Sequence, residues 1–129
     1  MARIVVCEDD PAILKLLQLA LRENGHELLV ASDGLAGFAL IERERPDAIL
    51  TDVTMPRMNG LELADAVRAR PDLASIPIVF LSASAQRVQV EAGYRHGATA
   101  YVTKPFRAAA LRSALAQVLA RRDDPATNE

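Results

Sequence analysis

The sequence predicts a single α/β domain built on a parallel sheet that helices cover on both faces. Two observations support this prediction. Five short apolar runs alternate along the 129 residues with five segments that carry helical spacing or helix-capping residues. No internal repeat or low-complexity block interrupts this alternation. Because parallel strands are joined by right-handed crossovers, the carboxyl ends of all the strands should lie at one edge of the sheet.

The first two strands are predicted at Arg3–Cys7 and Glu27–Ala31, which are short runs rich in aliphatic residues. Between them, Pro11 suits the first turn of a helix and Asp10 suits its N-cap. This first helix should end near Gly25, a residue that commonly terminates helices.

The central strand is predicted at Ala48–Asp52, an apolar run that stops abruptly at an acidic residue. The helix before it should open at Asp33 and Gly34 and stop at Pro46. The strand therefore brings the carboxylate of Asp52 to the edge of the sheet where ligands bind in open α/β folds.

The second half of the chain continues the same alternation. Expected elements are a helix over residues 61–70, a strand over 76–81, a helix over 86–96, a strand over 99–103 and a helix over 108–121. The helix over 86–96 contains Gly93, which costs about 1 kcal/mol relative to alanine. Residues 123–129 are expected to form a frayed tail, so the domain should span residues 1–122.

Composition excludes several classes of protein. The formal net charge of −2 gives no broad electrostatic preference for nucleic acid or membrane surfaces. The single cysteine, Cys7, excludes an internal disulfide. No charged leader or apolar span of about 20 residues marks export or membrane insertion. We therefore expect a cytoplasmic protein that makes no direct contact with nucleic acid or membrane.

Polar side chains follow four of the five predicted strands. They are Glu8 and Asp9 after the first strand, Asp52 at the end of the third, Ser82 after the fourth and Lys104 after the fifth. If the first and third strands are neighbours, Asp9 and Asp52 approach closely. Two like charges about 4 Å apart repel by about 4 kcal/mol at an effective dielectric constant near 20. A counter-ion is therefore required.

Carboxylates without a histidine or thiolate ligand favour a hard cation, and Mg²⁺ fits best, with Mn²⁺ as an alternative. An aspartate is ionised at neutral pH and needs no general base, so Asp52 is a credible nucleophile toward phosphorus. Lys104 and the hydroxyl of Ser82 would hold the phosphoryl oxygens.

Five motifs stand in order along the chain. They are the pair Glu8 and Asp9, then Asp52 with Pro56 and Gly60 behind it, then Ser82 and Ala83, then Tyr101, then Lys104, Pro105 and Phe106. Together, from residue 3 to about residue 120, they resemble the receiver domain of two-component response regulators. The resemblance implies a flavodoxin-like, doubly wound sheet of five strands in the order 2-1-3-4-5, with five helices.

The resemblance also implies a role for each site residue. Asp52 would accept a phosphoryl group from a sensor histidine kinase or a histidine phosphotransfer protein. Ser82 and Lys104 would hold that group, and Tyr101 would be the aromatic switch. Serine is less usual than threonine at position 82, and the pair Thr99 and Ala100 before Tyr101 is also unusual.

Metal binding is assigned by the same resemblance. Asp9, Asp52 and the backbone carbonyl of Thr54 would bind Mg²⁺ directly, and Glu8 would bind it through water. The protein would be a single-domain regulator that switches a protein-binding face toward a downstream target or relays the phosphoryl group onward.

Two other readings stay open at this point. A phosphatase of the haloacid-dehalogenase type also uses an aspartyl nucleophile, but it places the nucleophile on the first strand with a second Asp two residues on, where this chain has Thr54. A phosphate-independent receiver-like binding module would be expected to have lost Asp52, Asp9 or Lys104. We therefore expect a signalling module, not a conventional enzyme, with self-catalysed phosphotransfer and autodephosphorylation at Asp52.

Overall fold

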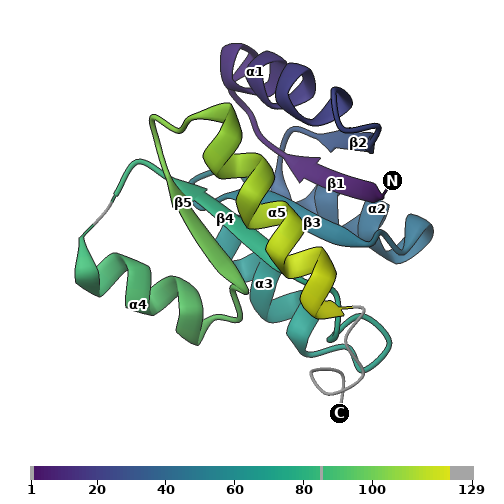
Figure 1. Ribbon diagram of the computed structural model, residues 1–129. Helices are drawn as coiled ribbons and strands as arrows, with labels where there is room; N and C mark the ends of the chain where they lie inside the picture. Colours follow the sequence, from purple (N-terminus) through teal and green to yellow (C-terminus); the bar gives the residue numbers. More distant parts are fainter. Residues whose placement is uncertain (1, 85, 123–129) are drawn as a thin grey trace.

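The computed structural model describes residues 2–84 and 86–122, with side chains up to residue 120. Its five strands form one parallel sheet in the order β2-β1-β3-β4-β5 (Figure 1). The strands are β1 Arg3–Cys7, β2 Glu27–Ala31, β3 Ala48–Asp52, β4 Ile78–Ser82 and β5 Ala100–Thr103. The predicted flavodoxin-like strand order is confirmed. The predicted tail at residues 123–129 lies outside the described residues.

Five helices cover the two faces of the sheet. They are α1 Pro11–Arg22, α2 Gly34–Glu44, α3 Gly60–Arg68, α4 Arg87–Arg95 and α5 Ala108–Arg122. One core lies under α1 and α5, where Leu17 and Leu111 pack with Val6 and Leu50. The second lies under α2 and α3, where Ile41 and Leu63 belong to the same cluster as strand residues such as Val5 and Phe80. Successive residues of each strand thus serve opposite cores, because side chains alternate across a strand.

Two interior strands, β3 and β4, are mostly apolar because both of their faces are covered. All residues of β3 and β4 are buried, as expected for the middle of a parallel sheet. β4 begins later than predicted, because the Ile76 N–H donates to the Leu73 carbonyl at 3.0 Å and Pro77 has no N–H to donate. The strand then continues to Ser82, one residue further than predicted.

Helix caps explain where most helices begin. Asp10 accepts a hydrogen bond from the Ala12 N–H at 2.9 Å, which confirms it as the N-cap of α1. Asn59 and Glu62 form a reciprocal capping box that starts α3 at residue 60, one residue earlier than predicted. α4 has no side-chain cap. Among the described residues, none of the helices has the length and apolarity needed to cross a membrane.

α2 lies very close to β1 at a position that only glycine allows. A Cβ atom on Gly37 would overlap the Sγ atom of Cys7, which is fully buried. Burial also raises the pKa of the Cys7 thiol to about 12, so Cys7 acts as a small apolar residue of the core.

Because of this contact, the effect of Gly37→Ala on stability should depend on whether Cys7 is present. Gly37→Ala should lower the free energy of unfolding, because overpacking costs about 1 to 3 kcal/mol and exceeds the helix-propensity gain of up to about 1 kcal/mol. In a Cys7→Ala background the same substitution should be neutral or stabilising, since the sulfur is gone. Urea denaturation of the four proteins measures both effects, and an equal loss in the two backgrounds would show that Cys7 is not the obstacle.

Candidate functional site

Three carboxylates converge where β1 and β3 end. Glu8 and Asp9 follow β1, and Asp52 is the last residue of β3, which pairs with β1 so that Cys7 lies opposite Thr51. One oxygen from each of Glu8, Asp9 and Asp52 lies within 4.8 Å of the others. Glu8 and Asp52 are buried and Asp9 is exposed. The predicted approach of these acids is therefore present.

Lys104 lies against this acidic cluster, which we define as Glu8, Asp9 and Asp52. Its Nζ atom donates to Asp52 Oδ2 at 2.8 Å and to Glu8 Oε1 at 3.1 Å. Burial lowers the pKa of Lys104, but hydrogen bonds and charge from Asp52 and Glu8 outweigh burial, so this pKa lies above its ordinary value. The ammonium group is therefore charged at neutral pH.

Glu8 is held entirely by protein donors. Its side chain is inaccessible to solvent, Oε1 accepts from Lys104, and Oε2 accepts from the Asp10 N–H at 3.1 Å. Burial raises the pKa of Glu8 and the charge of Asp52 raises it further, while the bonds from Asp10 and Lys104 act in the opposite direction. A carboxylate with both oxygens in use fits the predicted indirect metal role better than a direct one.

The donor set at this edge of the sheet suits a divalent cation. The cluster holds three carboxylates and Lys104 pairs with two of them, so negative charge exceeds positive charge. All the side-chain ligands on offer in the cluster are oxygens, with no imidazole or thiolate, and such sites prefer hard cations.

The turn after Asp52 is tight. The Thr51 hydroxyl donates to the Asp52 carbonyl at 2.9 Å, and the Gly60 N–H donates to the Val53 carbonyl at 2.8 Å. A Cβ atom on Gly60 would overlap the Asp52 carbonyl, so glycine is needed there for space. The Thr54 N–H faces Asp52 Oδ1 at 3.4 Å. The metal role of the Thr54 carbonyl stays a prediction.

Ser82 ends β4, one residue beyond the position opposite Asp52. It is buried, its hydroxyl accepts from the Ser84 N–H at 3.1 Å, and its carbonyl accepts from the Lys104 N–H at 2.7 Å. The backbone bond joins the ends of β4 and β5, so Ser82 and Lys104 have a fixed relative position next to Asp52.

Tyr101 connects the segment after β4 to α4. Its hydroxyl donates to the Ser84 carbonyl at 3.0 Å, and its ring meets Phe80 edge-on with centroids 6.5 Å apart. A Cβ atom on Gly93 would lie 3.0 Å from the Tyr101 ring and 3.1 Å from the Phe80 ring. Glycine at position 93 lowers the helix propensity of α4, but it lets the helix approach these two rings closely.

The sequence matches the response regulator receiver domain over residues 4–116, which is most of the chain. The chain belongs to the receiver domain family of two-component response regulators.

Individual relatives agree with this assignment. The receiver domain is 35% identical over 122 residues to the DNA-binding response regulator MtrA of Mycolicibacterium smegmatis, covering 95% of this chain and 52% of MtrA. The chain thus spans about half the length of that relative.

Two solved receiver-type structures have nearly the same fold. The chemotaxis response regulator CheY4 of Vibrio cholerae has a TM-score of 0.87 at 31% identity, covering 92% of this chain and 98% of CheY4. The receiver domain of a sensor histidine kinase from Pseudomonas aeruginosa PAO1, which has a magnesium ion coordinated in its active site cleft, has a TM-score of 0.86 at 29% identity. That match covers 92% of this chain and 98% of the other.

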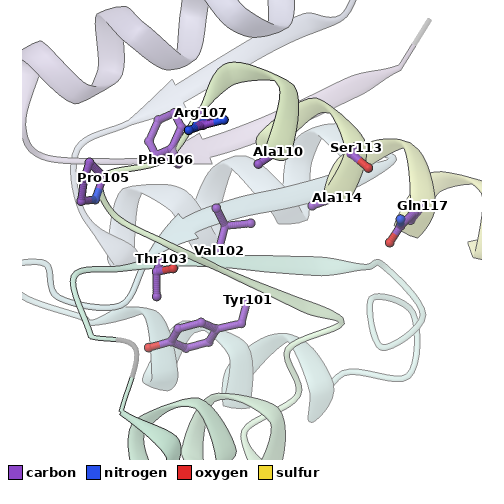
Figure 2. A pocket seen from close by; sticks show the side chains of 10 residues that line it. All are labelled: Tyr101, Val102, Thr103, Pro105, Phe106, Arg107, Ala110, Ser113, Ala114 and Gln117. Carbon is purple, nitrogen blue, oxygen red and sulfur yellow. The ribbon is translucent and has the colours of Figure 1, made fainter.

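The receiver domain also has a hollow of about 530 Å³ between β5 and α5. Figure 2 shows Tyr101 and Val102 on the strand side, Phe106 and Arg107 just before α5, and Gln117 further along the helix. Tyr101 is one of the residues that line this hollow, and none of Glu8, Asp9 and Asp52 lines it.

One pair near the site was missed by sequence reasoning. Arg57, in the loop after β3, donates from Nε and Nη2 to Asp33 Oδ2 at 2.9 and 2.6 Å. The sequence marked Asp33 only as the start of a helix. The two residues are 24 positions apart, and no motif in a single sequence signals their contact. Only the strand order, which places the ends of β2 and β3 on either side of β1, brings the two loops into the same region.

Metal binding at the acidic cluster can be tested through stability. Mg²⁺ should raise the melting temperature of the wild type, because a ligand of the folded state stabilises it by mass action. Asp9→Asn should lose this response and be at least as stable as the wild type in EDTA, since it removes one repelling charge.

Asp10→Asn is the matched control, because asparagine also caps helices and Asp10 is not in the cluster. It should keep the full Mg²⁺ response in thermal melts. If Asp9→Asn is less stable in EDTA, Asp9 is held by a protein contact and the cluster has no excess charge to relieve.

Proposed function

We propose that Asp52 accepts a phosphoryl group from a phosphohistidine of a sensor histidine kinase or histidine phosphotransfer protein. The observation that carries this proposal is the Lys104 ammonium, held 2.8 Å from Asp52 at the edge of the acidic cluster. A carboxylate oxygen of Asp52 would form a bond to phosphorus as the phosphorus–nitrogen bond to histidine breaks, and the electron pair stays on the imidazole nitrogen.

Lys104 and Ser82 would hold the transferred group. The Lys104 ammonium would turn from the Asp52 carboxylate toward the phosphoryl oxygens, where a charge-assisted hydrogen bond is stronger. The Ser82 hydroxyl accepts one bond from Ser84 and retains its own proton for donation to a phosphoryl oxygen.

Mg²⁺ is the proposed cofactor, with Mn²⁺ as an alternative. Asp9, Asp52 and the Thr54 carbonyl would bind it directly, and Glu8 would bind it through water. Bound Mg²⁺ would supply positive charge opposite the carboxylates and the phosphoryl oxygens. The magnesium ion in the similar Pseudomonas aeruginosa receiver domain supports this assignment.

The receiver domain, proposed to span residues 1–122, would act as a signalling module in the cytoplasm, with autodephosphorylation at Asp52 rather than turnover of a separate substrate. Its partners would be the kinase or phosphotransfer protein and a downstream target protein. MtrA is named as DNA-binding, but this chain covers only 52% of it. The net charge of −2 gives this region no electrostatic basis for contacting DNA or membrane directly.

Phosphorylation can be tested with a small donor. Acetyl phosphate with Mg²⁺ should add one hydroxylamine-labile phosphoryl group, and Asp52→Ala should abolish it. The other carboxylate beside Lys104 and Asp9 is Glu8, whose side chain is inaccessible to solvent and accepts hydrogen bonds at both oxygens. Intact-protein mass spectrometry measures the addition. Equal labelling of the variant would refute the assignment, and absence of labelling in the wild type would favour a phosphate-independent binding module.

We also propose that α4 and the adjoining hollow form the face that changes on phosphorylation. The C-terminal end of α4 is anchored, since His96 Nδ1 contacts Asp65 at 2.8 Å and Arg68 donates to the Gly97 carbonyl at 2.7 Å. Its N-terminal end has no side-chain cap. Ser82, two residues before the Ser84 carbonyl that Tyr101 binds, links a phosphoryl group to this free end.

Gly93→Ala tests this route. The added Cβ would press on the Tyr101 ring, so the change in hydrogen exchange over residues 86–96 caused by beryllofluoride, a phosphate mimic, should shrink. Gln89→Ala is the control, because Gln89 is exposed in α4 and the change raises helix propensity without touching Tyr101. If both variants reduce this change in hydrogen exchange equally, the stability of α4 controls the change and the contact with Tyr101 does not.

A further inference from the structure

A second ionic contact joins the loops that follow β2 and β3. Both Arg57 donors bind one oxygen of Asp33, at 2.9 and 2.6 Å. The other oxygen of Asp33 accepts from the Ala36 N–H at 2.8 Å and caps α2. Only 7% of the Asp33 side chain is exposed, against 62% for Arg57. A carboxylate this deeply buried needs its cation, because leaving it unpaired is costly.

The backbone makes a second link at the same place. The Gly34 N–H donates to the Met58 carbonyl at 3.1 Å. A Cβ atom on Gly34 would overlap that carbonyl, so the start of α2 and the loop at residues 53–59 are in direct backbone contact. Two independent interactions therefore hold this loop against α2.

The loop has an unfavourable backbone conformation at the residue that makes the ion pair. Arg57 has φ of +67°, in the left-handed region that residues with a Cβ atom avoid. Such a conformation persists where surrounding contacts hold it. The contacts to Asp33 supply that restraint.

The same loop carries Thr54, whose carbonyl is a proposed ligand of the metal. Groups around a metal site that orient its ligands have large effects on affinity even though they never touch the metal. The position of this loop therefore bears on metal binding, and the contact between Arg57 and Asp33 helps to fix that position.

We propose that the Asp33–Arg57 pair is a positioning element that holds the loop at residues 53–59 and thereby sets the affinity of the acidic cluster for its divalent cation. This inference rests on the proposed function, because it concerns the metal that the proposed phosphotransfer requires. Coulomb attraction alone predicts that Arg57→Ala binds the cation more tightly, because removing the Arg57 charge leaves the surroundings more negative. The positioning role predicts weaker binding.

The test is calorimetric titration of the whole chain with Mg²⁺ at low salt. Arg57→Ala should weaken Mg²⁺ binding by about tenfold, the lower end of effects measured for residues that orient metal ligands. Arg57→Gly should weaken it as much while melting at a higher temperature than Arg57→Ala in EDTA, because glycine accepts positive φ. Hydrogen exchange over residues 53–59 should be faster in both variants than in the wild type.

Arg70→Ala is the matched control. Arg70 also pairs with two carboxylates, those of Asp72 and Glu42, but neither belongs to the acidic cluster. It should leave Mg²⁺ affinity unchanged. Equal or tighter Mg²⁺ binding by Arg57→Ala would overturn the positioning role and leave the proposed function intact. If Arg57→Gly regained affinity along with stability, the role would be overturned as merely structural. A wild type that binds no Mg²⁺ would overturn both proposals.

Discussion

Repulsion among carboxylates is the constraint on which this edge of the molecule depends. The parallel sheet brings the ends of β1 and β3 together, so Glu8, Asp9 and Asp52 come within 4.8 Å of one another. Lys104 alone among the described residues binds two of them, and it reaches the cluster from beyond β5. The strand order therefore leaves the site with more negative charge than Lys104 neutralises. Functional sites commonly retain such unfavourable charge, and the rest of the fold stabilises it.

The partly buried Lys104–Glu8 contact has a role that surface ion pairs do not share. Exposed pairs such as Arg87 with Glu91 contribute little, because water screens both charges. Glu8 is inaccessible to solvent, so its charge depends on Lys104 and on the Asp10 N–H. If Lys104 turns toward a phosphoryl group, Glu8 loses a partner. Such a change would couple the proposed chemistry at Asp52 to the electrostatics of the whole edge.

Much of the fold and of the acidic cluster could be predicted from the sequence, for a physical reason. Apolar runs and caps such as Asp10 are local signals, and a parallel sheet then gathers the strand ends at one edge. The unpredicted features are contacts between distant segments. The Asp33–Arg57 pair joins two loops, and Gly93 is explained by rings of β4 and β5. The late start of β4 reflects a backbone hydrogen bond before Pro77, which the apolar pattern of residues 76–81 does not record.

α4 is anchored by side-chain contacts at its C-terminal end and has no side-chain cap at its N-terminal end, so the helix can rotate about its C-terminal end. Its nine residues span about 13 Å, at 1.5 Å per residue. With Arg68 and Asp65 holding the far end, a rotation of about 10° would displace the uncapped end by about 2 Å. The anchored end is held by polar contacts, but Gly93 lies close to the rings of Tyr101 and Phe80, so these two rings would have to adjust when the helix rotates. A displacement of about 2 Å at the uncapped end, which follows Ser84 in the chain, would change the shape of the surface that another protein meets.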